Sequence, residues 1–292
     1  MSVSDYFSTF CTNLRMSDET VEKISLRFKQ ITKRINLDYR NISSETAYSL
    51  YVGSYGRGTE IWTSDIDIIV QLPYEIYKRF DNYSSNGQSA LLQEVKTVLQ
   101  KTYSTSFIKG DGQVIGINFT DGINFEILPS FINKNDSYTY PDSNNGGSWK
   151  TTDPKQEIAA LNKRNAESNN NLKRLCRMAR AWVRKCDVPM NGILIDTLAY
   201  KFIYNWQYKD KSYLYYDFMS RDFFKYLSEI DKETEYWLAP GSNKHVLKKG
   251  NFQNKAKDAY EKALLAIKFE SDNKSYSAKQ EWRNIYGSSF PE

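Results

Sequence analysis

Apolar residues first recur at helical spacing over residues 18–41, "DETVEKISLRFKQITKRINLDYRN". The positions that repeat at steps of three and four are Val21, Ile24, Phe28, Ile31 and Ile35. This spacing is that of one buried helix face, so the pattern predicts a long amphipathic helix near the start of the chain.

Short strand-like segments follow this helix. Strands are predicted over residues 47–53, 64–73, 105–110, 113–120 and 123–131, with a helix over 89–103. Asp-Gly pairs at Asp111-Gly112 and Asp121-Gly122 separate the last three strands, as expected for hairpin turns.

The second half of the chain has a different pattern. Residues 133–154 carry many turn formers and few core residues, which predicts a long loop that is either a linker or a functional flap. Only helices are predicted beyond it, over 154–167, 170–185, 192–206, 216–230 and 251–270. The predicted fold is α+β, with a small mixed sheet backed by helices in residues 1–150, a helical lobe in 151–292 and a cleft between them.

Composition narrows the chemistry. The 292 residues are 40% apolar and 26% charged, as in a soluble globular protein. Three cysteines without a C-x-x-C spacing fit a reduced, cytoplasmic chain. With a single histidine, His245, a Cys/His zinc module is excluded and Ser-His or Cys-His catalysis is not expected. No signal peptide and no transmembrane helix are predicted, and the net charge of +5 is weak evidence for an anionic ligand.

Two aspartates stand one residue apart on a predicted strand. Because side chains alternate along a strand, Asp65 and Asp67 project from one face while Ile66, Ile68 and Val70 point into a core. Two neighbouring carboxylates suit a hard divalent cation such as Mg²⁺, which also holds substrate phosphates. A bare D-x-D is more often a pair of solvated acids on an edge strand.

A glycine-rich loop precedes these acids. Gly53 and Ser54 end one strand, and Gly56 and Gly58 keep the next turn open, so backbone N–H groups there can approach phosphate oxygens. An ordinary glycine-rich turn is the alternative.

A third carboxylate is expected on an adjacent strand, and Glu126 in "GINFEILPSF" supplies it. Three such carboxylates can hold two metal ions for in-line phosphoryl displacement, and Glu126 can also accept the proton of the attacking hydroxyl. Taken alone, Glu126 is more often a surface residue of an edge strand.

The segments "GSYGRGTEIWTSDIDIIV" and "FEILPSF" resemble the G-S-x(8–12)-D-x-D signature and third-carboxylate strand of polymerase-β-like nucleotidyltransferases. The loop "NNGGSWKTTDP", the helix "LKRLCRMARAW", "KKGNFQNKA" and "EWRNIYGSSFP" extend the resemblance. With them, the chain is similar to the bacterial cGAS/DncV-like nucleotidyltransferases (CD-NTases), which carry the SMODS domain of anti-phage CBASS operons.

The resemblance implies two Mg²⁺ ions, replaceable by Mn²⁺, at Asp65, Asp67 and Glu126, with Gly53 and Ser54 on the donor triphosphate. It implies synthesis of a cyclic di- or trinucleotide second messenger from ATP, GTP or both, with pyrophosphate release and a separate effector protein. It also places a triphosphate-binding cation on the helix of residues 171–185. The cations of that helix are Lys173, Arg177, Arg180 and Arg184. Arg180 is the candidate, and a solvated basic face is the alternative.

Two other functions stay open from the sequence. One is a nucleotidyltransferase that adenylylates a protein or a small molecule, and the other is an inactive nucleotide-binding scaffold. Neither an extended nucleic acid nor a membrane is expected as a partner, because no dense basic tail and no apolar span occur. A cytoplasmic monomer is expected.

Overall fold

A computed structural model describes residues 2–61 and 65–292 and shows an α+β fold with a mixed sheet. The chain divides into two compact units. The sheet unit comprises Met16–Gly56 and the described part of Thr63–Lys155. The helical unit comprises Gln156–Glu292, the described residues before Met16, and the described part of Arg57–Trp62.

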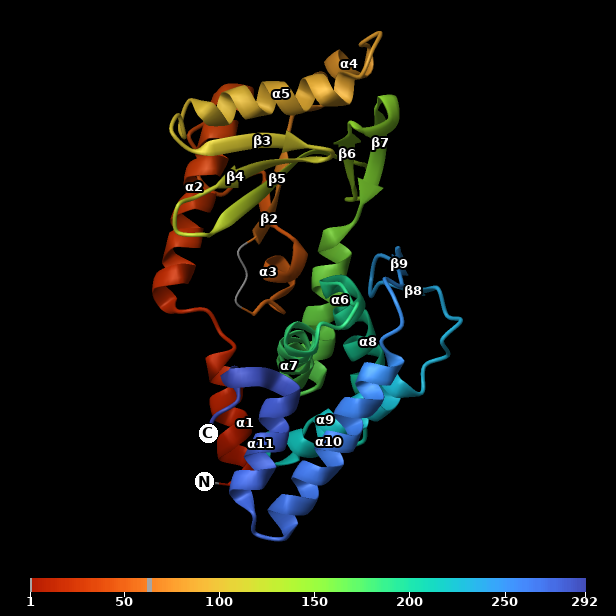
Figure 1. The fold of residues 1–292 in the computed structure, drawn as a ribbon. Helices are drawn as coiled ribbons and strands as arrows, with labels where there is room; N and C mark the ends of the chain where they lie inside the picture. The colour runs from red at the N-terminus through yellow and green to blue at the C-terminus, as the bar shows by residue number, and fades with distance from the viewer. Residues whose placement is uncertain (1, 62–64) are drawn as a thin grey trace. The chain divides into compact units, whose positions relative to one another are not determined.

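The sheet unit contains a seven-stranded sheet with helices on it (Figure 1). Its helices are α2 (Asp18–Arg40), α3 (Gly53–Arg57), α4 (Tyr74–Asp81) and α5 (Gly87–Gln100). Its strands are β1 (Ser49–Tyr51), β2 (Asp65–Gln71), β3 (Phe107–Asp111), β4 (Val114–Asn118), β5 (Asn124–Ile132), β6 (Tyr138–Asp142) and β7 (Ser148–Thr152). The order is β1-β2-β5-β4-β3, with β6 pairing β5 and β7 pairing β6. Among the strand pairs of this sheet in the described residues, only β2–β5 is parallel.

Helix α2 confirms the prediction for residues 18–41. Ser17 caps its start and Asn41, in the left-handed conformation, ends it. Four of its five apolar positions are buried in one core with β2 and α5, whereas Val21 is 40% exposed. Burying each such side chain contributes about 1.5–3 kcal/mol, which is how this face holds the helix against the sheet. The predicted strand at 64–73 begins at Ser64, which lies outside the described residues.

The prediction of a loop over residues 133–154 is wrong, because β6 and β7 form an antiparallel hairpin there. The turn contains a short 3₁₀ helix (Asn144–Gly146), and Asn145, Gly146 and Gly147 have positive φ. Trp149 packs against Tyr77 and Phe131 and donates its indole N–H to Asp81 at 2.8 Å. The turn formers of this segment therefore serve a tight hairpin, and its aromatic residues anchor the strands.

The helical unit holds the remaining helices. They are α1 (Val3–Asn13), α6 (Pro154–Glu167), α7 (Asn171–Cys186), α8 (Gly192–Asn205), α9 (Tyr216–Ser228), α10 (Gln253–Ser271) and α11 (Ser275–Tyr286), with 3₁₀ turns at Tyr213–Tyr215 and Gly287–Ser289. The prediction of helices alone beyond residue 155 is wrong at β8 (Tyr236–Leu238) and β9 (His245–Leu247), which pair as a small hairpin. Three-residue strands are too short to show a period of two in the sequence.

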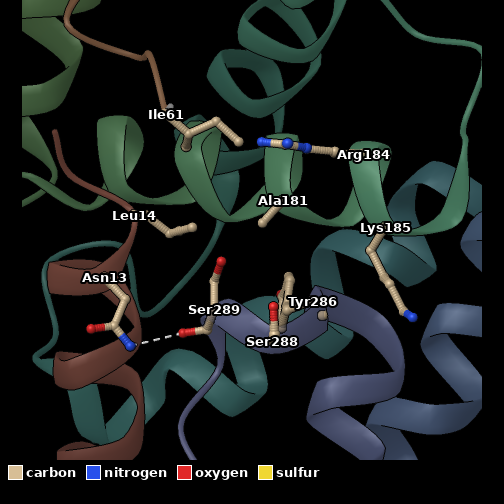
Figure 2. Close-up of a pocket in the computed structure, with 10 residues that line it drawn as sticks. Asn13, Leu14, Ile61, Ala181, Arg184, Lys185, Tyr286, Ser288 and Ser289 are labelled. Atoms are coloured by element: carbon tan, nitrogen blue, oxygen red, sulfur yellow. Dashed lines mark hydrogen bonds between the residues drawn. The ribbon is translucent and has the colours of Figure 1, made fainter. Parts of the chain in front are cut away.

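An aromatic cluster joins both ends of the chain within this unit. Phe7 and Phe10 of α1 are fully buried against Tyr286 and Phe290, with ring centroids 4.7 Å apart for Phe10 and Tyr286. The side chain of Asn13 donates to the carbonyl of Ser289 at 2.9 Å (Figure 2). In the described part of the chain, no helix is both long and apolar enough to cross a membrane.

One buried carboxylate binds three segments of the helical unit together. Asp196 on α8 is fully buried and accepts hydrogen bonds from Arg57 Nε and Thr59 Oγ1 at 2.9 Å, and from Arg180 Nη1 at 2.6 Å. Burial opposes ionisation of Asp196, but the charges of Arg180 and Arg57 hold its pKa at about 2. The residues just after α3 are thereby fixed to α7 and α8.

We predict that Asp196→Asn lowers the free energy of unfolding by about 3–5 kcal/mol, because it removes the counter-charge of the buried Arg180 and leaves Arg57 with the more distant carboxylate of Glu157, 3.6 Å away. Urea denaturation followed by circular dichroism measures the loss. The difference in unfolding free energy between the variant and the native protein should narrow as the pH falls from 3.8, the ordinary pKa of an aspartate, toward about 2. Over this range Asp196 loses its charge in the native protein. Asp187→Asn, at an exposed left-handed position, is the matched control. Equal unfolding free energies of Asp196→Asn and Asp187→Asn would contradict a stabilising role for the hydrogen bonds and ion pairs around Asp196.

Candidate active site

Two adjacent strands bring the three predicted carboxylates together. Asp65 and Asp67 alternate on β2 with the buried Ile66 and Ile68, so both carboxylates leave the sheet on the same side. In the parallel register of β2 and β5, Asp67 lies opposite Glu126 and Asp65 lies opposite Asn124. The structure thus joins residues 59 positions apart in the sequence.

The strands that carry these acids have neighbours on both sides over much of their length. At Glu126, β5 lies between β2 and β4, whereas β1 pairs with β2 over Ile68–Val70 and the Val52 amide extends this contact to Asp67. Ile69, on the same face as Asp65 and Asp67, is 1% exposed and packs with Val52 and Tyr138. Asp67 is partly buried, whereas Asp65 and Glu126 are exposed at this end of the sheet.

Negative charge is concentrated at this position. Burial raises the pKa of Glu126 above its ordinary value, and the negative charges of Asp67 and Asp65 raise it further. The amide of Asn124 donates to Asp65 Oδ1 at 3.3 Å. The two aspartates make ionisation of Glu126 less favourable, so a bound cation would relieve a repulsion that the folded chain itself creates.

The donor set fits a hard divalent cation. Carboxylate oxygens are the ligands that Mg²⁺ and Mn²⁺ prefer, and the site presents carboxylates from two strands without a histidine or cysteine. Over the described residues, no three His, Cys, Asp or Glu side chains are already gathered around a common metal position.

The glycine-rich loop lies directly against the same carboxylates. Gly53 has φ +59°, and a Cβ added to it would lie 1.8 Å from Asp67 Oδ2, so only glycine fits there. The neighbouring amide of Val52 donates to the carbonyl of Asp67 at 2.9 Å. Helix α3 begins at Gly53 and places Ser54 in its first turn. The loop and the D-x-D strand thus form one site within the sheet unit.

Arg180 lies in the helical unit and is buried with its guanidinium on Asp196. Nη1 and Nη2 donate to the two carboxylate oxygens at 2.6 and 3.0 Å, and Nη2 also donates to the carbonyl of Gly192 at 3.0 Å. The role of Arg180 as a triphosphate cation stays a prediction. Its partner was not visible in the sequence, since Asp196 lies on a different helix.

Lys173 is a second basic residue of α7, and it lies against Gly58 within the helical unit. Its Nζ lies 3.1 Å from where a Cβ on Gly58 would stand, and it donates to Asn162 Oδ1 at 2.6 Å. Burial and the nearby charge of Arg177 lower the pKa of Lys173. In the described ranges, no carboxylate lies within ion-pair distance of this ammonium. In the sequence, Lys173 is indicated only by the row of basic residues along this helix. That row does not show which of its members would lie near a phosphate.

Comparison with known proteins gives a consistent result. The family model described as "Second Messenger Oligonucleotide or Dinucleotide Synthetase domain" matches residues 1–165. A Bacillus cereus (strain VD146) protein named probable cyclic nucleotide synthase is 25% identical in a 181-residue alignment that covers 57% of this chain. That match spans about half, 51%, of the relative's own length.

Solved structures show the same fold. CdnC of E. coli MS115-1, solved with ATP, superposes with a TM-score of 0.75 at 14% identity and covers 99% of each chain. CdnG of Bradyrhizobium diazoefficiens, in complex with GTP, gives 0.68 at 10% identity over 97% of this chain and 94% of its own. The cyclic AMP-GMP synthase DncV of Vibrio cholerae gives 0.61 at 14% identity over 99% and 87%. At these identities the likeness concerns the fold.

We predict opposite effects of Glu126→Gln on the metal-free and the Mg²⁺-loaded protein. Because the pKa of Glu126 is raised by folding, its ionisation destabilises the metal-free fold as the pH rises through that pKa. In EDTA at pH 7 the variant should therefore unfold at a higher temperature than the native protein, and the two should converge below pH 4.5, the ordinary pKa of a glutamate. Addition of Mg²⁺ should raise the unfolding temperature of the native protein more than that of the variant.

Differential scanning fluorimetry measures both shifts. Glu22→Gln, at an exposed position of α2, is the control and should respond to Mg²⁺ as the native protein does. An equal gain from Mg²⁺ in Glu126→Gln would rule out Glu126 as a ligand.

Proposed function

The chain belongs to the family of Second Messenger Oligonucleotide or Dinucleotide Synthetase domains, and on that premise we propose that it joins nucleoside triphosphates into a cyclic oligonucleotide. The observation that carries the proposal is the register of β2 and β5, which sets Glu126 beside Asp67 with Gly53 against the same carboxylate. That geometry supplies carboxylates and a phosphate loop at one place, as nucleotidyl transfer requires.

In the proposed reaction, the ribose hydroxyl of one nucleotide attacks the α-phosphorus of another and pyrophosphate leaves. The new P–O bond forms as the bond to pyrophosphate breaks, and Glu126, whose pKa is raised, takes the hydroxyl proton. A second transfer, or a third, closes the ring. Bound at Asp65, Asp67 and Glu126, two Mg²⁺ or Mn²⁺ ions would supply charge stabilisation and a more acidic attacking hydroxyl.

Gly53 and Ser54 are the proposed ligands of the donor triphosphate. Without a Cβ at Gly53, a phosphate oxygen can come close to both the backbone and Asp67. The Ser54 hydroxyl, in the first turn of α3, is a further donor. Lys173, which lies against Gly58 four residues further on, is the second candidate beside Arg180 for the cation that binds the triphosphate.

The wider setting follows from the family and is part of the proposal. The substrates are ATP, GTP or both, and the product is a second messenger in anti-phage signalling that a separate effector protein reads. The enzyme acts as a monomer in the cytoplasm, without an extended nucleic acid as partner.

We predict a phosphatase-resistant product when the purified protein is incubated with labelled ATP and GTP, singly and together, with Mg²⁺ or Mn²⁺. Asp65→Asn and Asp67→Asn should each reduce it by more than about 100-fold, because even the outer-shell partners of metal ligands contribute 10–100-fold. Asp136→Asn, an exposed acid in the same unit, is the control. Label found on protein would instead indicate adenylylation, and no turnover with any mixture would indicate a binding scaffold.

We also predict that Lys173→Gln raises the KM for the nucleoside triphosphate about tenfold or more, the loss expected for one charge-assisted hydrogen bond. The unfolding temperature should stay close to that of the native protein. Lys185→Gln, which removes an exposed cation from the same helix, should leave KM unchanged. An unchanged KM in Lys173→Gln would leave Arg180 as the triphosphate cation.

A further inference from the structure

A small pocket in the helical unit is lined by three arginines. The lining residues are Cys11, Thr12, Arg15, Arg174, Arg177 and Tyr213. Its volume is about 90 Å³, roughly that of three water molecules in the liquid. This space suits a single tetrahedral or planar anionic group and is too small for a whole nucleotide.

Two of the three guanidiniums are already held in place. Arg174 donates to the hydroxyl of Tyr216 at 3.2 Å and lies over the ring of Tyr213, 4.8 Å from its centroid. Arg177 donates to the carbonyl of Gly58 at 2.7 Å and, through Nε, to the carbonyl of Glu60 at 3.0 Å. These contacts are to neutral acceptors, so they orient the cations without cancelling their charge.

The positive charge of the pocket is largely uncompensated. Over residues 2–61 and 65–292, the one carboxylate within ion-pair distance of the three arginines is Glu60, 3.5 Å from Arg177. Arg15 has neither a hydrogen bond nor an ion pair through its side chain in that same part of the chain. Burial raises the pKa of the Cys11 thiol to about 12, so it adds no negative charge at neutral pH. Three cations against one acid leave a net charge close to +2.

We propose that this pocket binds a phosphate dianion, either inorganic phosphate or the phosphate of a phosphomonoester. The charge of such a group at neutral pH, about −1.5 to −2, matches that of the pocket. Guanidiniums bind phosphate oxygens through parallel N–H bonds, and arginines held in place by other contacts do so at a low cost in conformational entropy. The pocket holds the phosphate alone, and the rest of a phosphomonoester extends into solvent.

The bound phosphate also fixes the segment that follows α3. Arg177 joins the pocket to the carbonyls of Gly58 and Glu60, and an anion on this guanidinium restrains it and the backbone that it holds. Gly58 follows α3 directly, so the restraint acts on the backbone at the C-terminal end of that helix. Any effect of this restraint on nucleotide binding rests on the proposed function, whereas the phosphate site itself does not.

Isothermal titration in metal-free buffer tests the site, on an Asp65→Asn/Asp67→Asn background that weakens binding at the carboxylates. Inorganic phosphate and AMP are the two probes, and a short oligonucleotide without terminal phosphates is the third. We expect phosphate or AMP to bind with one-to-one stoichiometry. Binding of both, in competition, shows that free phosphate suffices, and binding of AMP alone assigns the site to phosphomonoesters.

Arg15→Gln is the decisive variant, since the Arg15 side chain makes no contact that the fold needs in the described structure. It should weaken binding by about tenfold or more. Arg184→Gln is the matched control, because Arg184 is also an exposed arginine but lines a separate pocket of about 620 Å³ beside Ile61 and Ala181 (Figure 2). Unchanged binding in Arg15→Gln, equal loss in both variants, or binding of the oligonucleotide alone would overturn the proposal.

Amide hydrogen exchange tests the connection to α3. Phosphate should slow exchange in a peptide covering residues 55–61 of the native protein and leave that peptide unaffected in Arg15→Gln. Binding without this protection would retain the phosphate site and overturn its connection to the loop.

Discussion

The buried carboxylate of Asp196 is the interaction on which the arrangement of the helical unit depends. A fully buried charge is costly unless it is paired, and here two arginines and a threonine hydroxyl surround it. Arg57, the last residue of α3, and Thr59 belong to the helical unit, and this one carboxylate holds them to α7 and α8.

On β2 and β5, in contrast, carboxylates lie next to other carboxylates. Asp196 is neutralised by the chain's own cations, and its pKa falls to about 2. Glu126 has two aspartates as neighbours, and its pKa rises. A carboxylate thus stabilises the fold in one place and opposes it in the other. Such a local conflict is expected at functional sites, where the missing charge is supplied by a ligand.

Helix α7 shows how one basic stripe divides among several tasks. Arg180 pairs with Asp196, Arg177 holds the carbonyls of Gly58 and Glu60, and Lys173 lies against Gly58. Arg184 is exposed on a separate pocket. All four have the same charge and similar spacing, so only their neighbours distinguish a structural cation from a candidate ligand of phosphate.

The sequence by itself determined the local features of this protein. The spacing of Ile24, Phe28 and Ile31 predicted α2, and the alternation around Asp65 and Asp67 placed both acids on one face of a strand. These predictions succeed because helical and strand periodicity are properties of a few consecutive residues.

Tertiary structure decided which distant residues meet. The placement of Glu126 beside Asp67 needs the parallel register of two strands 59 residues apart, and the pairing of Arg180 with Asp196 needs the packing of α7 on α8. The sequence predicts a loop where β6 and β7 form a hairpin, because turn-forming residues outnumber alternating ones in this segment. Register and helix packing are selected by the whole core, through burial and pairing that no short window of sequence contains.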